Sequence, residues 1–198
     1  MQTTTSIDWR AYNTSAAGRP PRRVVGRAIE VVGDGARRVA LDIGAGGGSD
    51  SFEFARRGWT VHAYDTDDTI ATRMVENERL AGEVRLHVGD VAHAEEFPAA
   101  DIVYSAYSLP MLGADLPAVW ERLRRALRPG GVVAVDLFGQ RDSWVEREDI
   151  ATFSEQEIEE MFRGLEVLSR DVRDEDGRTF SGDKKHWHVI STLARRPR

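Results

Sequence analysis

The sequence has no cysteine among its 198 residues. Disulfide bonds, thiolate metal sites and cysteine nucleophiles are therefore excluded. No apolar run approaches the roughly 20 residues that a membrane-spanning helix needs. Residues 1–8 have neither the basic start nor the apolar segment of a signal peptide. These absences lead us to expect a cytoplasmic protein that does not act at a membrane.

The sequence also lacks an excess of positive charge. It carries 33 acidic and 27 basic residues, a formal net charge of −6 at pH 7. Nucleic-acid binding needs a basic face, so no nucleic-acid partner is expected. The arginine cluster at 122–128 alternates with leucines, which is typical of a solvated helix face. The length suits one ordinary α/β domain with a sizeable core.

Strands and helices alternate from about residue 22, which predicts a mostly parallel sheet covered by helices. The expected strands are 38–43, 59–64, 84–88, 101–106, 132–138, 165–172 and 185–194. The expected helices are 22–32, 49–57, 68–80, 116–127 and 154–163. Only the polar turn 174–177 separates the last two strands, so they should pair antiparallel. Residues 1–21 are polar and form an N-terminal arm, and residues 22–198 form a single domain.

The most informative segment is the glycine-rich turn within 39–48, which reads VALDIGAGGG. Glycines allow the backbone to approach a ligand closely. Asp65 ends the next apolar run and can accept hydrogen bonds from ribose hydroxyls. The pattern therefore predicts a nucleoside site. It disfavours NAD, because Ser49 stands where the NAD fingerprint needs glycine or alanine.

Three segments and the last strand together resemble the class I S-adenosylmethionine-dependent methyltransferases. The segments are L-D-I-G-A-G-G-G at 41–48, V-G-D-V at 88–91 and L-R-P-G-G at 127–131. The resemblance covers essentially the whole chain. It implies a Rossmann-like fold with a seven-stranded, mostly parallel sheet, an antiparallel last strand and helices on both faces. F-G-Q-R-D-S-W at 138–144 and K-H-W-H-V at 185–189 resemble a small bacterial subgroup of the tellurite-resistance type.

The resemblance implies S-adenosylmethionine as cofactor and S-adenosylhomocysteine as its product. The residues that it assigns to the cofactor are Asp42, Gly44, Ala45, Gly46, Asp65, Thr66, Asp90, Val91, Ser105 and Ala106. Asp65 would hold the ribose hydroxyls, and Asp90 would face the adenine. The residues themselves leave other roles open: Asp42 can order the glycine loop, Asp65 can cap a helix, and Asp90 can form a turn.

Two residues of the arm are further candidates for cofactor binding. Tyr12 can lie over the sulfonium by cation–π attraction. Arg19 can pair with the methionine carboxylate. The arm would then act as a lid over the cofactor. A disordered tail is the alternative.

Two residues are candidates for catalysis, Tyr107 after the fourth strand and His186 at the start of the last one. A general base is needed only if the acceptor carries its proton at neutral pH. Tyr107 can instead be a packing aromatic. His186 and His188 share one face of their strand and can be structural. No third ligand accompanies them, so no metal site is expected.

These features predict methyl transfer from S-adenosylmethionine to a small-molecule acceptor. Residues 106–112 depart from the N-P-P-Y motif of enzymes that methylate nucleic-acid bases, and no insertion forms a separate substrate domain. Two alternatives remain: an enzyme of the same fold that uses S-adenosylmethionine without methylating, and a non-catalytic module that binds it. The protein is expected to be a monomer or a homodimer.

Overall fold

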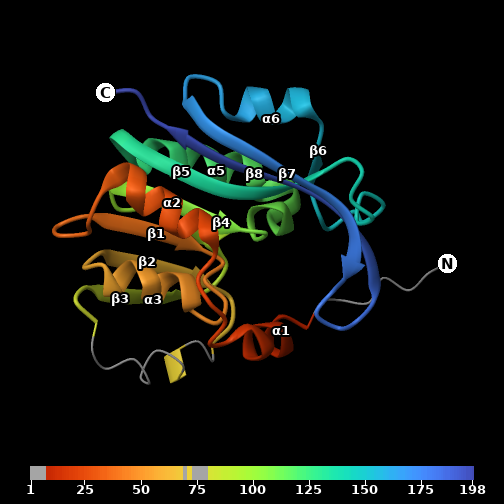
Figure 1. Cartoon of the computed structure of the whole chain (residues 1–198), viewed down its shortest axis with the longest axis horizontal. Coiled ribbons are helices and arrows are strands. Elements are labelled where there is room, and N and C mark those ends of the chain that lie inside the picture. Colours follow the sequence, from red (N-terminus) through yellow and green to blue (C-terminus); the bar gives the residue numbers. More distant parts are fainter. Residues whose placement is uncertain (1–7, 69–70, 73–79) are drawn as a thin grey trace.

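The computed structural model describes residues 8–68, 71–72 and 80–198, which form one eight-stranded sheet (Figure 1). The strands follow the order β3-β2-β1-β4-β5-β8-β7, and β6 pairs with β5. Their bounds are β1 Val39–Ile43, β2 Thr60–Asp65, β3 Glu83–Val88, β4 Ala100–Ala106, β5 Leu127–Gly139, β6 Thr152–Phe153, β7 Glu166–Arg178 and β8 Lys184–Arg195. Strand β8 is antiparallel to both of its neighbours, and the other pairs are parallel.

The helices cover both faces of this sheet (Figure 1). They are α1 Trp9–Ala16, α2 Arg23–Val32, α3 Ser49–Arg56, α5 Leu116–Ala126 and α6 Glu155–Met161, with 3-10 turns η1 Val91–His93 and η2 Leu109–Asp115. Ser154 and Glu157 form the capping box that starts α6. No helix within the described residues is long and apolar enough to cross a bilayer.

Two hydrophobic clusters hold the helices to the sheet. Leu41 and Val103 of the central strands pack on the side of α5 and α6. Their neighbours Ala40 and Ile102 point the other way, toward α2 and α3. Successive side chains of a strand alternate between faces, so a strand that is buried on both sides must be apolar throughout. This explains why the central strands appear in the sequence as continuous apolar runs.

The predicted parallel sheet with an antiparallel last strand is confirmed. The structure differs from the expectation in several places, and one of them is the start of β5, which lies at Leu127 and not at residue 132. Strand β6 adds an eighth strand, residues 9–16 of the arm form α1, and the polar stretch 174–177 continues β7. The polar stretch stays extended because Asp174 and Asp176 both bond His186 across the hairpin. Most of the expected helix 68–80 lies outside the described residues.

Candidate active site

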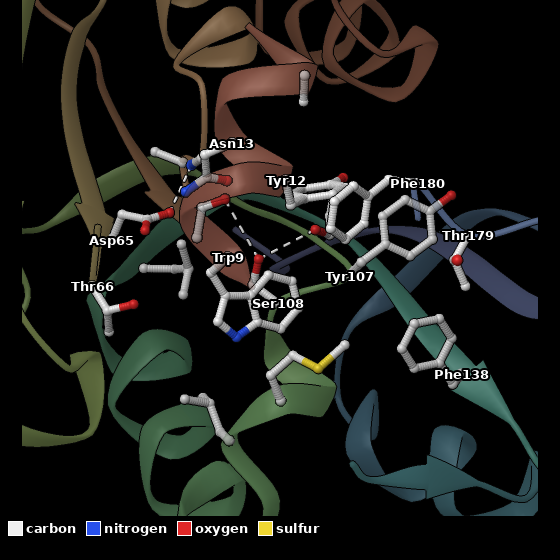
Figure 2. Close-up of a pocket in the computed structure, with 18 of the residues that line it drawn as sticks. Trp9, Tyr12, Asn13, Asp65, Thr66, Tyr107, Ser108, Phe138, Thr179 and Phe180 are labelled. Atoms are coloured by element: carbon white, nitrogen blue, oxygen red, sulfur yellow. Dashed lines mark hydrogen bonds between the residues drawn. The ribbon is translucent and has the colours of Figure 1, made fainter. Parts of the chain in front are cut away.

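A cavity of about 1200 Å³ lies at the carboxyl ends of the parallel strands (Figure 2). This is where open α/β sheets bind their ligands. One end of the cavity is lined by the glycine turn, Asp65 and Asp90, and we call it the acidic end. The other is lined by Tyr107, Phe138, Trp144 and Trp187, and we call it the aromatic end. Trp9 and Tyr12 of α1 line the cavity as well.

The glycine turn is shaped by backbone conformations that favour glycine. Gly44, Gly46 and Gly48 have φ angles of +76°, +55° and +81°, in the region that side chains disfavour. A Cβ atom on Gly44 would lie 1.8 Å from Ser108 Oγ. The Gly44 and Ala45 amides both donate to the carbonyl of Tyr64, at 2.8 and 3.0 Å. The turn is therefore fixed to the end of β2, with its backbone exposed to the cavity.

Asp65 is held at the tip of β2 by two backbone amides. Its Oδ2 accepts from the Gly46 N–H at 2.7 Å, and its Oδ1 accepts from the Asp67 N–H at 2.8 Å. A carboxylate can accept about four hydrogen bonds, so each oxygen keeps capacity for a ligand hydroxyl. The structure brings Asp65 together with Gly44, Ala45, Gly46, Thr66, Asp90 and Val91 around one end of the cavity. We predicted from the sequence that all of these residues belong to one cofactor site.

Asp90 and Val91 begin the 3-10 turn η1. The Asp90 side chain accepts from the Ala92 N–H at 2.9 Å, so the residue caps this turn. It also lines the cavity. Both roles that the sequence left open for Asp90 are therefore compatible with its place in the structure.

Two expected cofactor residues, Asp42 and Ser105, do not line the cavity. Asp42 is buried in β1, and its Oδ2 accepts from Ser51 Oγ of α3 at 2.6 Å. Ser105 is buried in β4 and donates to the Ile43 carbonyl at 3.0 Å. Both side chains tie elements together beneath the glycine turn. These bonds give Asp42 the loop-ordering role that the sequence left open, and a role of either residue beside the cofactor stays a prediction.

Burial and the neighbouring Asp50 carboxylate raise the pKa of Asp42 from 3.8 to about 7. Between these two pH values the folded chain holds a proton that the unfolded chain has released, so rising pH removes stability across this window. Replacing Asp42 by Asn abolishes this loss. We expect Asp42→Asn to gain about 1–3 kcal/mol relative to wild type between pH 5 and pH 8. Urea unfolding at both pH values measures it.

The control for this measurement is the exposed residue Asp183. The Asp183→Asn variant should keep the pH dependence of the wild-type protein, because its side chain is exposed and is not buried beside another carboxylate as Asp42 is. An Asp42→Asn variant whose difference from wild type is the same at pH 5 and pH 8 would contradict the assignment.

Arg19 lines the cavity but is already paired with a buried carboxylate. Its two terminal nitrogens lie 3.1 and 2.5 Å from the oxygens of Asp50. Asp50 also accepts from the Arg22 N–H at 2.9 Å and from the Tyr104 hydroxyl at 2.8 Å. Burial acts to raise the pKa of Asp50, but these bonds hold it below its ordinary value. Arg19 therefore attaches the segment between α1 and α2 to helix α3. Its pairing with a ligand carboxylate stays a prediction.

Helix α1 covers the glycine turn. Asn13 is buried and donates to Asp67 Oδ2 at 3.0 Å. A Cβ atom on Gly47 would lie 3.0 Å from the Cα atom of Ala17, just past the helix. On its other side, α1 places the Tyr12 ring 5.3 Å from Phe180 in the turn between β7 and β8 (Figure 2). The helix thus bridges the glycine turn and this hairpin, and the alternative of a disordered tail is wrong for residues 9–16.

Tyr107 directly follows β4 and has a strained conformation, with a φ of +65°. Its ring lies 5.9 Å from Phe138 and 6.1 Å from Trp187. The guanidinium of Arg22 lies 5.2 Å from its centre. Burial raises the pKa of the Tyr107 hydroxyl above its ordinary value of 10.0. The hydroxyl stays protonated at neutral pH, so the geometry supports a wall of the cavity rather than a general base.

His186 does not line the cavity. Its ring bonds Asp174 at 2.9 Å and Asp176 at 2.7 Å, and its neighbour Trp187 is the residue that lines the cavity. Side chains alternate along a strand, so His186 and His188 share the opposite face. His186 thus begins β8 at the predicted edge of the sheet, but its side chain does not line the cavity, and this placement does not support the predicted role as a general base. Hydrogen bonds to Asp176 and Asp174 raise the pKa of His186.

A buried ion pair joins Lys185 to Asp142 behind the aromatic end. Asp142 also accepts from the N–H groups of Trp144 at 3.0 Å and His188 at 3.1 Å. The Lys185 ammonium lies 3.7 Å from the centre of the Trp144 ring and 4.6 Å from that of Trp187. Burial lowers the pKa of Lys185, although Asp142 opposes the shift. The pair fixes the rings that form the cavity wall.

Sequence reasoning missed several residues of this site. Asn13 comes from the predicted arm, Phe180 from the residues between the predicted turn and the last strand, and Lys185 from the start of that strand, where the sequence predicted no role for it. A signal for Lys185 exists: it lies two residues from Trp187 and therefore on the same face of β8. The contacts of Asn13 and Phe180 depend on how α1 packs, and no local pattern indicates them.

The chain matches the family described as "Methyltransferase domain" over residues 41–135. A malonyl-[acyl-carrier protein] O-methyltransferase of Xylella fastidiosa is 33% identical over 119 residues. That stretch spans 57% of this chain and only 39% of the relative.

Solved structures share the fold. TehB from Haemophilus influenzae superimposes with a TM-score of 0.73 at 17% identity, over 95% of this chain and 67% of that chain. The N-methyltransferase NodS from Bradyrhizobium japonicum WM9, in complex with S-adenosyl-L-homocysteine, gives a TM-score of 0.68 at 15% identity, over 96% and 87% of the two chains. These likenesses establish a Rossmann-like fold with one antiparallel strand, as the sequence predicted.

Proposed function

Because this chain belongs to the class I S-adenosylmethionine-dependent methyltransferases, we propose that it transfers a methyl group from S-adenosylmethionine to a small-molecule acceptor. The observation that carries this proposal is the continuity of the cavity. Its acidic end and its aromatic end form one space, and the backbone of the glycine turn faces the acidic end. One molecule at each end would lie in contact with the other.

The residues of the acidic end fit the cofactor. Asp65 offers two carboxylate oxygens to the ribose hydroxyls, and Asp90 offers an acceptor to the adenine amino group. Val91 supplies an apolar contact, and the glycine turn leaves room for close approach of the methionine portion. A volume of about 1200 Å³ exceeds what one drug-sized ligand needs. It therefore has space for a nucleoside and a small acceptor together.

Bound S-adenosylmethionine supplies a methyl group that is activated by a positively charged sulfur. The protein's task is to align the acceptor with this group and to exclude water. Tyr107, Phe138 and Trp187 provide a rigid apolar wall for the acceptor, and the Lys185–Asp142 pair holds that wall. Tyr107 keeps its proton at neutral pH, so it donates or packs and does not remove a proton.

Helix α1 is part of the proposed machinery as a lid over the cofactor. Its contacts reach the glycine turn through Asn13 and the hairpin through Tyr12. A covered cavity favours a small acceptor over a macromolecule. We further place the protein in the cytoplasm as a monomer or homodimer. Removing residues 1–21 should speed the release of S-adenosylhomocysteine in stopped-flow measurements, and unchanged release would remove α1 from the proposal.

Product analysis tests the proposed reaction. The protein is incubated with S-adenosylmethionine and a panel of small acceptors, and the nucleoside products are separated by chromatography. Release of S-adenosylhomocysteine with a methylated acceptor supports the proposal. Methylthioadenosine would instead indicate another use of the cofactor. Calorimetric binding of S-adenosylmethionine without turnover on any acceptor would indicate a binding module.

A further inference from the structure

The aromatic end of the cavity combines flat apolar walls with positive charge. The guanidinium of Arg173 lies 5.1 Å from the centre of the Trp187 ring, and that of Arg147 lies 5.9 Å from the centre of Trp144. Arg22 lies over the Tyr107 ring, and the positive charge of Arg173 acts to lower the pKa of the Tyr107 hydroxyl, against the larger effect of burial. These arginines all line the cavity. The surface therefore presents ring faces with guanidinium groups beside them.

The carboxylates that pair with two of these arginines stay outside the cavity. Arg173 bonds Glu175 at 2.7 Å, and Arg147 bonds Asp149 at 2.7 Å. Neither acid lines the cavity, and both are exposed. The acids that do line this end, Asp115, Glu146 and Asp183, are exposed at its rim. A ligand on the aromatic wall thus meets the guanidinium groups while their partner acids face solvent.

Within the part of the chain that the structure describes, the aromatic wall itself presents no histidine and no ionised tyrosine to remove a proton from the acceptor, and the carboxylates of this end are exposed. No histidine lies among the described residues that line the cavity. Burial keeps the Tyr107 hydroxyl protonated, and His186 faces the other side of β8. An acceptor that arrives ionised needs no base. Its oxygen–carbon bond forms as the sulfur–carbon bond breaks, the anion and the sulfonium become an ester or ether and a thioether, and no proton is released.

We propose that the acceptor is a planar aromatic acid in its ionised form, a carboxylate or an acidic phenolate, whose ring packs on Tyr107 and Trp187 and whose charge faces Arg173. This inference rests on the proposed function and names the substrate class of that site. Stacking on aromatic rings gives the wall its preference for a flat molecule. A guanidinium beside the wall prefers a carboxylate or phenolate oxygen over a neutral or cationic group.

Calorimetry with a matched set of probes tests the proposal. The protein is first saturated with S-adenosylhomocysteine and then titrated with 1-naphthoate, 1-naphthamide and 1-naphthylmethylammonium. The three share a ring system and differ in charge. We expect the carboxylate to bind about tenfold or more tighter than the amide, with the ammonium weakest. Benzoate and benzamide form a smaller pair, in case the naphthyl ring is too large.

Two variants test whether Arg173 causes the preference for the carboxylate over the amide. Arg173→Met should reduce the carboxylate-to-amide preference by about fivefold or more and leave the affinity for the amide within about twofold. Arg163→Met removes an exposed arginine whose partner is Glu160, away from the cavity, and should leave the preference intact. Equal affinities for acid and amide, no binding of either acid, or a preference that survives Arg173→Met would overturn the proposal.

The failure of this inference can be told apart from that of the proposed function. The first titration measures S-adenosylhomocysteine alone. A protein that does not bind it contradicts the proposed function. Normal binding of S-adenosylhomocysteine with no preference for the acids leaves the methyltransferase assignment in place and removes only the acceptor class.

Discussion

Replacing Asp142 with Ala is expected to lower the free energy of unfolding by about 3–5 kcal/mol, because it leaves a buried charge without its partner. Asp142 is fully buried, and it receives the Lys185 ammonium and the N–H groups of Trp144 and His188. The substitution leaves all three donors without an acceptor. A buried donor without an acceptor costs about 1–3 kcal/mol. Lys185 can shed part of the penalty by losing its proton, since burial already lowers its pKa.

Urea unfolding at pH 7 measures the loss, with Asp149→Ala as the matched control. Asp149 is also an aspartate paired with a basic side chain, but it is exposed. The control should therefore change stability by less than about 1 kcal/mol. Asp142→Asn keeps the shape and one acceptor oxygen, so it provides a milder variant if the alanine protein does not fold. A loss below about 1 kcal/mol for both Asp142 variants would show that the pair does not hold the aromatic wall.

A double variant separates the pair from its surroundings. Removing both charges with Asp142→Ala and Lys185→Met should cost less than the sum of the single changes, because no unpaired charge remains. The aromatic end should respond as well. Trp144 and Trp187 both contact the Lys185 ammonium, so their fluorescence should shift in each variant even under conditions where the protein stays folded.

The fold and the acidic end could be predicted from the sequence because both depend on local patterns. A strand that is buried on both faces must be a continuous apolar run, and such runs alternate with helical segments in this chain. The glycine turn and Asp65 lie at the ends of two such strands, β1 and β2, which are neighbours in the sheet. Their meeting at one edge follows from parallel pairing alone.

The aromatic end could not be predicted in the same way. Whether Trp187 or His186 faces the cavity depends on how the hairpin of β7 and β8 is oriented against β5, and a shift of one residue exchanges the two faces. The sequence places both residues at the correct edge of the sheet without fixing their direction. Arg141 and Asp142 are adjacent in the sequence, and their adjacency does not indicate which partners they bind. In the folded chain Arg141 turns to Asp174 and Asp142 turns to Lys185.

The position of α1 could not be predicted from the sequence for a similar reason. The segment is short and contains few strongly apolar residues, so its helix is stabilised by packing rather than by propensity. Its start does carry a local signal, since Asp8 accepts from the Ala11 N–H at 2.9 Å. The tertiary contacts of Asn13 and Tyr12 then decide where the helix lies. A cap indicates that a helix begins, but it says nothing of the surface that the helix will cover.

Asp65→Ala should weaken the binding of S-adenosylhomocysteine by about 30-fold or more. A hydrogen bond to a charged group contributes about 1.5–3 kcal/mol, and the proposed site has two ribose hydroxyls facing this carboxylate. The substitution acts in a second way. It removes the acceptor that holds the Gly46 and Asp67 amides, so the glycine turn loses part of its fixed shape. Both effects reduce affinity in the same direction, and calorimetry measures their sum.

Two further variants separate these contributions. Asp65→Asn keeps one acceptor oxygen and most of the shape, so it should lie between the wild-type protein and the alanine variant. Asp68→Ala removes an exposed carboxylate three residues along the chain, paired with Arg10, and should change affinity by about twofold at most. If Asp65→Ala binds S-adenosylhomocysteine as tightly as wild type while Asp68→Ala does not, the nucleoside lies elsewhere in the cavity. The hydrogen bond from the glycine turn to Asp65 would then only stabilise the local fold, and Asp65 would have no role in binding the nucleoside.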